Sequence, residues 1–93
     1  MHILLFPLAR SIRHLRERAG FTQPELAENL SRYVGKEITR SAVSMWENGD
    51  RTPKAYTLVR IAEYFDVSVD ALFGRGFGET EGDQFLKKVF DVD

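Results

Sequence analysis

Apolar side chains return every three or four residues along the first part of the chain. The recurring positions are Leu8, Ile12, Leu15 and Ala19. This spacing places them on one face of a helix, which turns once in about 3.6 residues. Gly20 stands where a helix commonly ends, so we predict a first helix over residues 8–19.

A second helix is predicted to begin after Thr22. Thr22 and Glu25 have the spacing of a capping box, and Pro24 suits the first turn, where the missing N–H costs little. Its inward stripe consists of Leu26, Ala27 and Leu30. The pattern continues to Val34, and Gly35 is the predicted stop.

Residues 38–53, ITRSAVSMWENGDRTP, contain a third helix with two different faces. Thr39 is its N-cap, and the turn signal Asn48-Gly49 ends it. One side carries Ala42, Val43 and Trp46. The other sides carry Arg40, Ser41, Ser44 and Met45. Because Trp46 shares the apolar side, we expect it in the core.

Two further helical patterns complete the series. The buried face of the fourth consists of Leu58, Ile61, Ala62 and Phe65. Its start stays open: either Thr52 caps it with Pro53 in the first turn, or it begins a residue or two later. Ser68 caps a fifth helix that runs to Leu72-Phe73. Five short helices with tight connections predict an all-α fold.

The two ends of the chain differ from this helical region. Residues 1–7 form an apolar arm that is far shorter than the roughly 20 residues of a membrane span. The arm also lacks the features of a signal peptide, so we expect a cytoplasmic protein with no membrane partner. These apolar residues pack either on the domain's own core or on a neighbouring subunit.

Residues 77–93 combine an acidic link with a short amphipathic helix. A lone helix of this length is marginal in water, so it needs a surface on which to pack. Three interpretations stay open: a sixth helix that completes the core, a dimer contact, or a frayed tail.

Composition narrows the class of protein. A chain of 93 residues accommodates a single domain. It has no cysteine, which excludes disulfides and cysteine-based zinc sites, and His2 and His14 are too few for a metal cluster. No carboxylate pair, activated nucleophile or phosphate-binding glycine loop is evident. We therefore expect neither a cofactor nor enzymatic activity.

The net charge of −1 conceals a strong polarity along the chain. Residues 1–60 carry ten Lys/Arg against six Asp/Glu, a net +4, whereas residues 61–93 carry three against eight, a net −5. A basic front attracts phosphates, and an acidic rear limits nonspecific adhesion.

The outward side of the third helix has the chemistry needed to read DNA. The major groove admits one helix, and side chains near its N-terminus must be short or forked to reach base edges. Arg40 can bond to guanine through two N–H groups, and Ser41 is small enough to approach a base. Free N–H groups at helix N-termini bind phosphate, which gives Gln23 and Thr39 positioning roles.

Three stretches, IRHLRERAGFTQPELAENL, ITRSAVSMWENGDRTP and LVRIAEYFDVSVDALFGRG, together resemble the helix-turn-helix family of phage repressors and Cro proteins, the XRE or Cro/CI type. The resemblance covers residues 8–76. It implies a compact five-helix, lambda-repressor-like domain that binds specific double-stranded DNA and controls transcription, here as a repressor. Members usually act as homodimers on palindromic operators.

The same resemblance implies roles for individual residues. Base contacts are expected from Arg40, Ser41, Ser44 and Met45. With the two helix N-termini, the expected phosphate contacts are Gln23, Thr39, Asn48, Arg51 and Lys54. Apart from the resemblance, the exposed arginines of the first helix are expected to be solvated, with a phosphate contact as the alternative: Arg10, Arg13 and Arg18.

A buried ion pair between Arg16 and Glu47 is also implied by the resemblance. The sequence supports it independently, because Glu47 follows the core-facing Trp46 and Arg16 follows the core-facing Leu15. Both residues are thus expected on the rim of one interface. Such a pair would fix the register of the helices more than it would add stability.

One segment departs from the family pattern. The connection SRYVGKE is longer by roughly a turn and a half of helix. We expect a longer second helix that reaches Val34, followed by a loop, GKEI. Arg32 and Lys36 then become additional phosphate contacts.

A protein-interaction module is the alternative function. Antitoxins of this family grip toxins while repressing their own operon. In this chain the gripping element for a protein partner would be the C-terminal GDQFLKKVFDVD.

Overall fold

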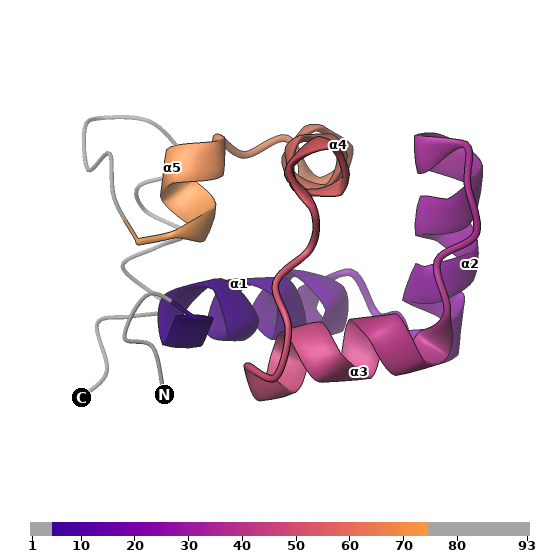
Figure 1. Cartoon of the computed structure of the whole chain (residues 1–93), viewed down its shortest axis with the longest axis horizontal. Helices are drawn as coiled ribbons and strands as arrows, with labels where there is room; N and C mark the ends of the chain where they lie inside the picture. Colours follow the sequence, from indigo (N-terminus) through magenta and orange to yellow (C-terminus); the bar gives the residue numbers. More distant parts are fainter. Residues whose placement is uncertain (1–4, 75–93) are drawn as a thin grey trace.

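The computed structural model describes residues 5–74. This part of the chain forms five α-helices and no strand, which confirms the all-α prediction (Figure 1). The helices are α1 (Leu5–Arg18), α2 (Gln23–Val34), α3 (Arg40–Asn48), α4 (Ala55–Phe65) and α5 (Val69–Leu72). The acidic link and amphipathic helix predicted for residues 77–93 lie outside the described residues.

α3 packs against both α1 and α2. In Figure 1, α1 and α3 run side by side along one edge of the molecule, and α2 stands across their end. α4 and α5 lie on the other side, where α5 contacts α1 and α4 contacts α2. The apolar side chains that this arrangement buries most deeply are Leu8, Ile12, Leu26, Leu30, Val43, Ile61 and Leu72.

Local signals set the ends of α2 and α3 as predicted. The capping box of Thr22 and Glu25 is present, and Thr39 Oγ1 accepts the N–H of Ala42 at 3.0 Å. Gly35 and Gly49 end these helices with φ of 85° and 79°, left-handed conformations that glycine adopts without steric cost. The predicted extent of α2 to Val34 is confirmed.

Two helices start at positions that the sequence did not fix. α1 begins at Leu5 rather than near residue 8, so Leu5–Pro7 belong to the helix and not to a separate arm. Pro7 fits there because the first N–H groups of a helix have no partner within it. α4 begins at Ala55, after the buried Pro53 and the extended Lys54, which decides for the later of the two starts.

The long connection between α2 and α3 is fixed by one serine. Ser31 Oγ accepts the N–H of Ile38 at 2.8 Å and contacts Ala27 O at 2.7 Å. Ile38 itself is buried against the core. The loop is thus anchored at its far end, immediately before α3 begins.

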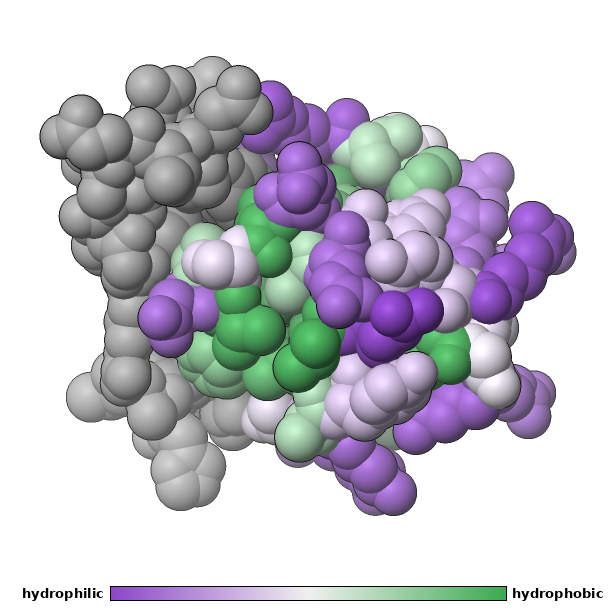
Figure 2. All heavy atoms as spheres, turned by 90° about the horizontal axis from the view of Figure 1, so that it is seen from above, coloured by the Kyte–Doolittle hydropathy of each residue, from purple (hydrophilic) through white to green (hydrophobic). Residues whose placement is uncertain are grey.

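The face formed by α4 and α5 lies away from α3 (Figure 1). Figure 2 views the molecule from this side and shows hydrophobic side chains gathered among hydrophilic ones. The exposed large hydrophobic residues of the described part are Tyr33, Tyr56 and Val59. No helix within residues 5–74 is both long enough and apolar enough to cross a membrane.

Candidate nucleic-acid interface

α3 presents two faces of different chemistry. Its outward positions are the exposed Arg40, Ser41 and Asn48 and the half-buried Ser44 and Met45. Its inward positions are Val43, Trp46 and Glu47. Trp46 is 7% exposed, which confirms its predicted place in the core. The four side chains expected to face bases therefore share one side of a helix whose opposite side is locked into the protein.

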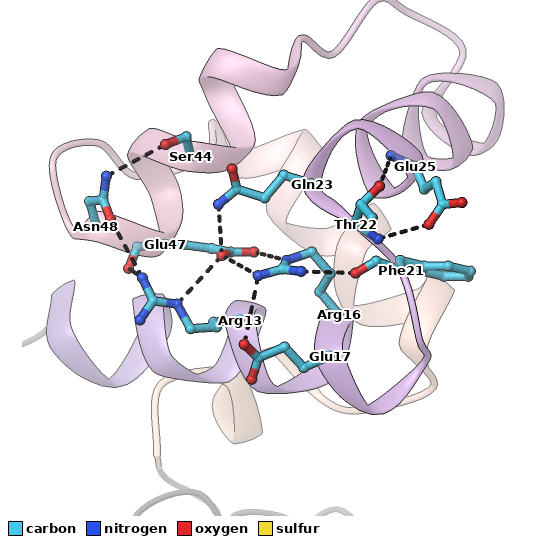
Figure 3. Close-up of polar contacts among 10 residues, drawn as sticks. All are labelled: Arg13, Arg16, Glu17, Phe21, Thr22, Gln23, Glu25, Ser44, Glu47 and Asn48. Carbon is cyan, nitrogen blue, oxygen red and sulfur yellow. Dashed lines mark hydrogen bonds and ion pairs between the residues drawn. The ribbon is translucent and has the colours of Figure 1, made fainter.

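The carboxylate of Glu47 is fully enclosed where α1, α2 and α3 meet (Figure 3). Arg16 Nε donates to Glu47 Oε2 at 2.6 Å, and Arg16 Nη2 donates to Oε1 at 3.0 Å. Arg16 Nη1 also donates to the carbonyl of Phe21 at 2.8 Å. The structure thus brings the expected pair together, but with Glu47 buried and not on the rim of the interface.

The environment of Arg16 favours its charged form. The hydrogen bonds to Glu47 raise the pKa of Arg16; burial acts in the opposite direction, and the negative charges of Glu47 and Glu17 add to the rise. Arginine is already protonated at every ordinary pH. The contribution of this ion pair to stability is therefore not lost by deprotonation of Arg16 in any usual buffer.

Gln23, the first residue of α2, is a further partner of Glu47. Its Nε2 donates to Glu47 Oε1 at 3.1 Å. An amide nitrogen carries two protons, so this bond occupies one of its donors. The side chain expected to contact a phosphate is thus held at the N-terminus of α2 by the same carboxylate that binds Arg16.

Arg13 lies one turn before Arg16 and reaches the same carboxylate. Its Nε is 3.5 Å from Glu47 Oε1, and its Nη2 is 3.5 Å from both the carbonyl of Glu47 and Oδ1 of Asn48. Arg13 is exposed, as expected, but its guanidinium also contacts the end of α3. The available signal was its spacing of three residues from Arg16, which places both on one side of α1.

The other side chains expected at phosphates lie around the ends of α3. Thr39 precedes the helix and is exposed, while Asn48 and Arg51 follow at its C-terminal end and are exposed as well. The backbone N–H of Arg51 bonds to the carbonyl of Met45 at 3.3 Å. Lys54 is exposed immediately before α4.

The two extra basic residues of the long connection are also exposed. Arg32 pairs with Glu28 at 2.7 Å across one turn of α2. Lys36 lies in the loop that precedes α3. Within residues 5–74, no three His, Cys, Asp or Glu side chains are grouped so that they could hold a metal ion.

Comparison with known proteins decides the family. A sequence model described as helix-turn-helix matches residues 12–72, from the middle of α1 to the end of α5. The chain belongs to the helix-turn-helix family. The family predicted from the sequence is thereby confirmed.

Three helix-turn-helix proteins illustrate the relationship. The chain is 32% identical over 84 residues to the HTH-type transcriptional activator BcrR of Enterococcus faecalis, covering 86% of this chain and 38% of BcrR. It is 32% identical over 68 residues to the HTH-type transcriptional regulator ImmR of Bacillus subtilis, covering 73% and 49%. YqaE, an HTH-type transcriptional regulator of the same species, is 30% identical over 83 residues, covering 89% and 66%.

These alignments span from 38% to 66% of the length of the three relatives. No solved structure matches the chain. The chain therefore spans only part of the length of these relatives, and the remainder of each relative has no counterpart in the alignment.

Proposed function

We propose that this helix-turn-helix protein is a sequence-specific, double-stranded DNA-binding transcriptional regulator that inserts α3 into the major groove. The observation that carries the proposal is the division of α3 into two faces. Its inner face is fixed by the core and by Glu47, while its outer face offers a guanidinium, hydroxyl groups and a thioether. A rigidly held helix with such a face can enter the groove without rearrangement.

Base reading is assigned to the outward side chains nearest the N-terminus of α3. Arg40 is the first helical residue and is exposed, so its fork can reach O6 and N7 of a guanine. Ser41 is exposed beside it and can bond to either partner of a base pair. Ser44 and Met45 lie one turn further and contact the next base pairs, with Met45 suited to a thymine methyl group.

Phosphate contacts position α3 and carry no sequence information of their own. We assign them to the N-terminal ends of α2 and α3, through Gln23 and Thr39, and to the exposed Asn48, Arg51 and Lys54. These residues border α3 at both of its ends. Contacts on either side of the groove would fix the depth and angle of the helix.

The regulatory output that we propose is repression by a homodimer on a palindromic operator. Occupying a promoter is sufficient for repression and requires no contact beyond DNA. The relatives BcrR and ImmR, named as a transcriptional activator and a transcriptional regulator, support control of transcription. We place the protein in the cytoplasm, where it acts by binding and not by catalysis.

Selection of preferred duplexes from a random DNA pool, with the protein's mass measured in the same buffer, tests this proposal. We expect a palindromic consensus with half-sites one helical turn apart, roughly 34–36 Å, and the mass of a dimer. Affinity for the selected duplex should fall steeply as salt rises.

A pool without enrichment above nonspecific binding would contradict the proposal. It would favour a protein-binding module that uses residues 77–93, and binding of that kind through apolar contacts would depend only weakly on salt. A monomer mass with a single asymmetric site would retain the DNA-binding function and overturn the dimer.

A further inference from the structure

The two arginines around Glu47 are held very differently. Arg16 makes two short bonds to the carboxylate, at 2.6 and 3.0 Å, and its side chain is only 13% exposed. The three contacts of Arg13 are all 3.5 Å long, at the outer limit for a hydrogen bond, and its side chain is 49% exposed. Arg16 is therefore the structural partner, and Arg13 is held only loosely.

The hydrogen bonds that Glu47 accepts also indicate that Arg16, and not Arg13, is its structural partner. Its oxygens already accept from Arg16 and from Gln23, so this acceptor is satisfied without Arg13. The other nearby carboxylate, that of Glu17, lies 3.9 Å from Arg16 and is 61% exposed, where solvent screens it. Arg13 therefore shares the single negative charge of Glu47 with Arg16, which holds that carboxylate at the shorter distance.

The guanidinium of Arg13 lies next to a residue that is assigned to the DNA backbone. Its Nη2 lies beside Oδ1 of Asn48 and the carbonyl of Glu47, at the C-terminal end of α3 (Figure 3). Asn48 is one of the residues assigned above to the DNA backbone. Weak contacts with these acceptors aim the guanidinium toward that site and cost little to exchange for a phosphate, a stronger partner for arginine.

We propose that Arg13 of α1 is a DNA phosphate contact, paired with Asn48 at the end of α3. The assignment rests on the proposed function, since it needs a bound duplex. It extends the interface from the helix-turn-helix pair to the first helix. Because a phosphate contact reads no base, Arg13 should strengthen binding to every sequence by a similar factor.

Salt titration of Arg13→Gln tests the assignment on two duplexes, one with the selected consensus and one of the same length with that sequence scrambled. The affinity of DNA binding falls as salt rises, and losing one phosphate contact makes the slope of log K against log salt shallower by about 0.9. Between 50 and 200 mM salt, the affinity advantage of the wild type should therefore shrink by about 3.5-fold. The loss should be similar on both duplexes, with a melting temperature close to that of the wild type.

Arg18→Gln is the matched control, because Arg18 is an exposed arginine at the end of the same helix. It removes the same charge and should leave the slope unchanged. Arg13→Lys should restore most of the slope, because lysine binds phosphate as a point charge.

An unchanged slope for Arg13→Gln, with the wild type still binding DNA, would overturn the assignment and leave the proposed function intact. Equal effects of Arg13→Gln and Arg18→Gln would overturn it too, since they would reflect net charge alone. If the wild type itself showed no salt-dependent DNA binding, the proposed function would fail and the assignment with it.

Discussion

Glu47 is a single residue on which three helices depend. Its enclosed carboxylate binds Arg16 of α1 and Gln23 of α2 while belonging to α3. A buried ion pair adds little stability over apolar residues of the same shape, but removing one partner leaves the other charge buried and unpaired. The network therefore matters chiefly for the orientation of α3 relative to α1 and α2.

Replacing Glu47 with Gln should destabilise the fold by about 3–5 kcal/mol, because the guanidinium of Arg16 would lose its counter-ion inside the protein. Urea unfolding followed by circular dichroism measures this cost. Glu28→Gln is the control, since Glu28 and Arg32 form a pair with side chains 66% and 72% exposed. That change should cost less than about 1 kcal/mol, and equal costs for the two variants would refute a special role for Glu47.

Arg40→Ala should weaken binding to the selected operator by about 1–3 kcal/mol and relax the preference at one base pair. The melting temperature should not change, since Arg40 is exposed. Competition binding with duplexes substituted at each position measures both effects. A loss that is uniform over all sequences would instead make Arg40 a phosphate contact.

At the scale of whole elements, α3 is a short helix, and local interactions define both of its ends. Thr39 caps its start and Gly49 its finish, while Ser31 anchors the loop before it through Ile38. The nine residues of α3 could not form a stable helix alone. Packing against α1 and α2 makes α3 rigid and decides which side it exposes, while the caps set where it begins and ends.

Thr39→Ala should lower stability by about 1 kcal/mol through loss of the N-cap bond to Ala42. Thr22→Ala is a control, because the hydroxyl of Thr22 likewise accepts the N–H three residues on, that of Glu25. If Thr39 also contacts a phosphate, Thr39→Ala should reduce DNA affinity more than Thr22→Ala does at similar stability. Thermal melts and binding isotherms recorded on both variants make this comparison, and parallel losses would restrict Thr39 to capping.

Along the whole chain, charge is divided between a basic first part, residues 1–60, and an acidic last part, residues 61–93. Residues 77–93 carry five acidic side chains and two lysines, against the net +4 of residues 1–60. Such a division should favour binding where α3 makes good contacts and oppose it elsewhere, because nonspecific affinity depends almost entirely on charge.

Neutralising three of these acids, by Glu79→Gln, Glu81→Gln and Asp83→Asn together, changes the net charge from −1 to +2. Binding to a scrambled duplex should become tighter at low salt, and the gain should fade as salt screens the charges. Lys87→Gln with Lys88→Gln is the opposite control and should weaken the same binding. Fluorescence anisotropy at several salt concentrations tests both, and no change in either variant would contradict the long-range effect.

Features with a local physical cause were predictable from the sequence. Apolar periodicity located the first four helices, and capping chemistry at Thr22, Thr39 and Ser68 placed the starts of α2, α3 and α5. The starts of two helices had no clear capping signal: the predicted start of α1 was wrong, and that of α4 stayed open. α1 begins at Leu5 and runs through Pro7, and α4 begins at Ala55, after the buried Pro53.

The sequence by itself determined the class of fold, the family and the outward residues of α3, because each of these follows from spacing within a single helix or from short motifs. Only the tertiary structure decided how deeply Glu47 is buried and that Gln23 and Arg13 join Arg16 around it. These contacts link residues 24 to 34 positions apart. They depend on the angles at which three helices pack, and no pattern within one helix specifies those angles.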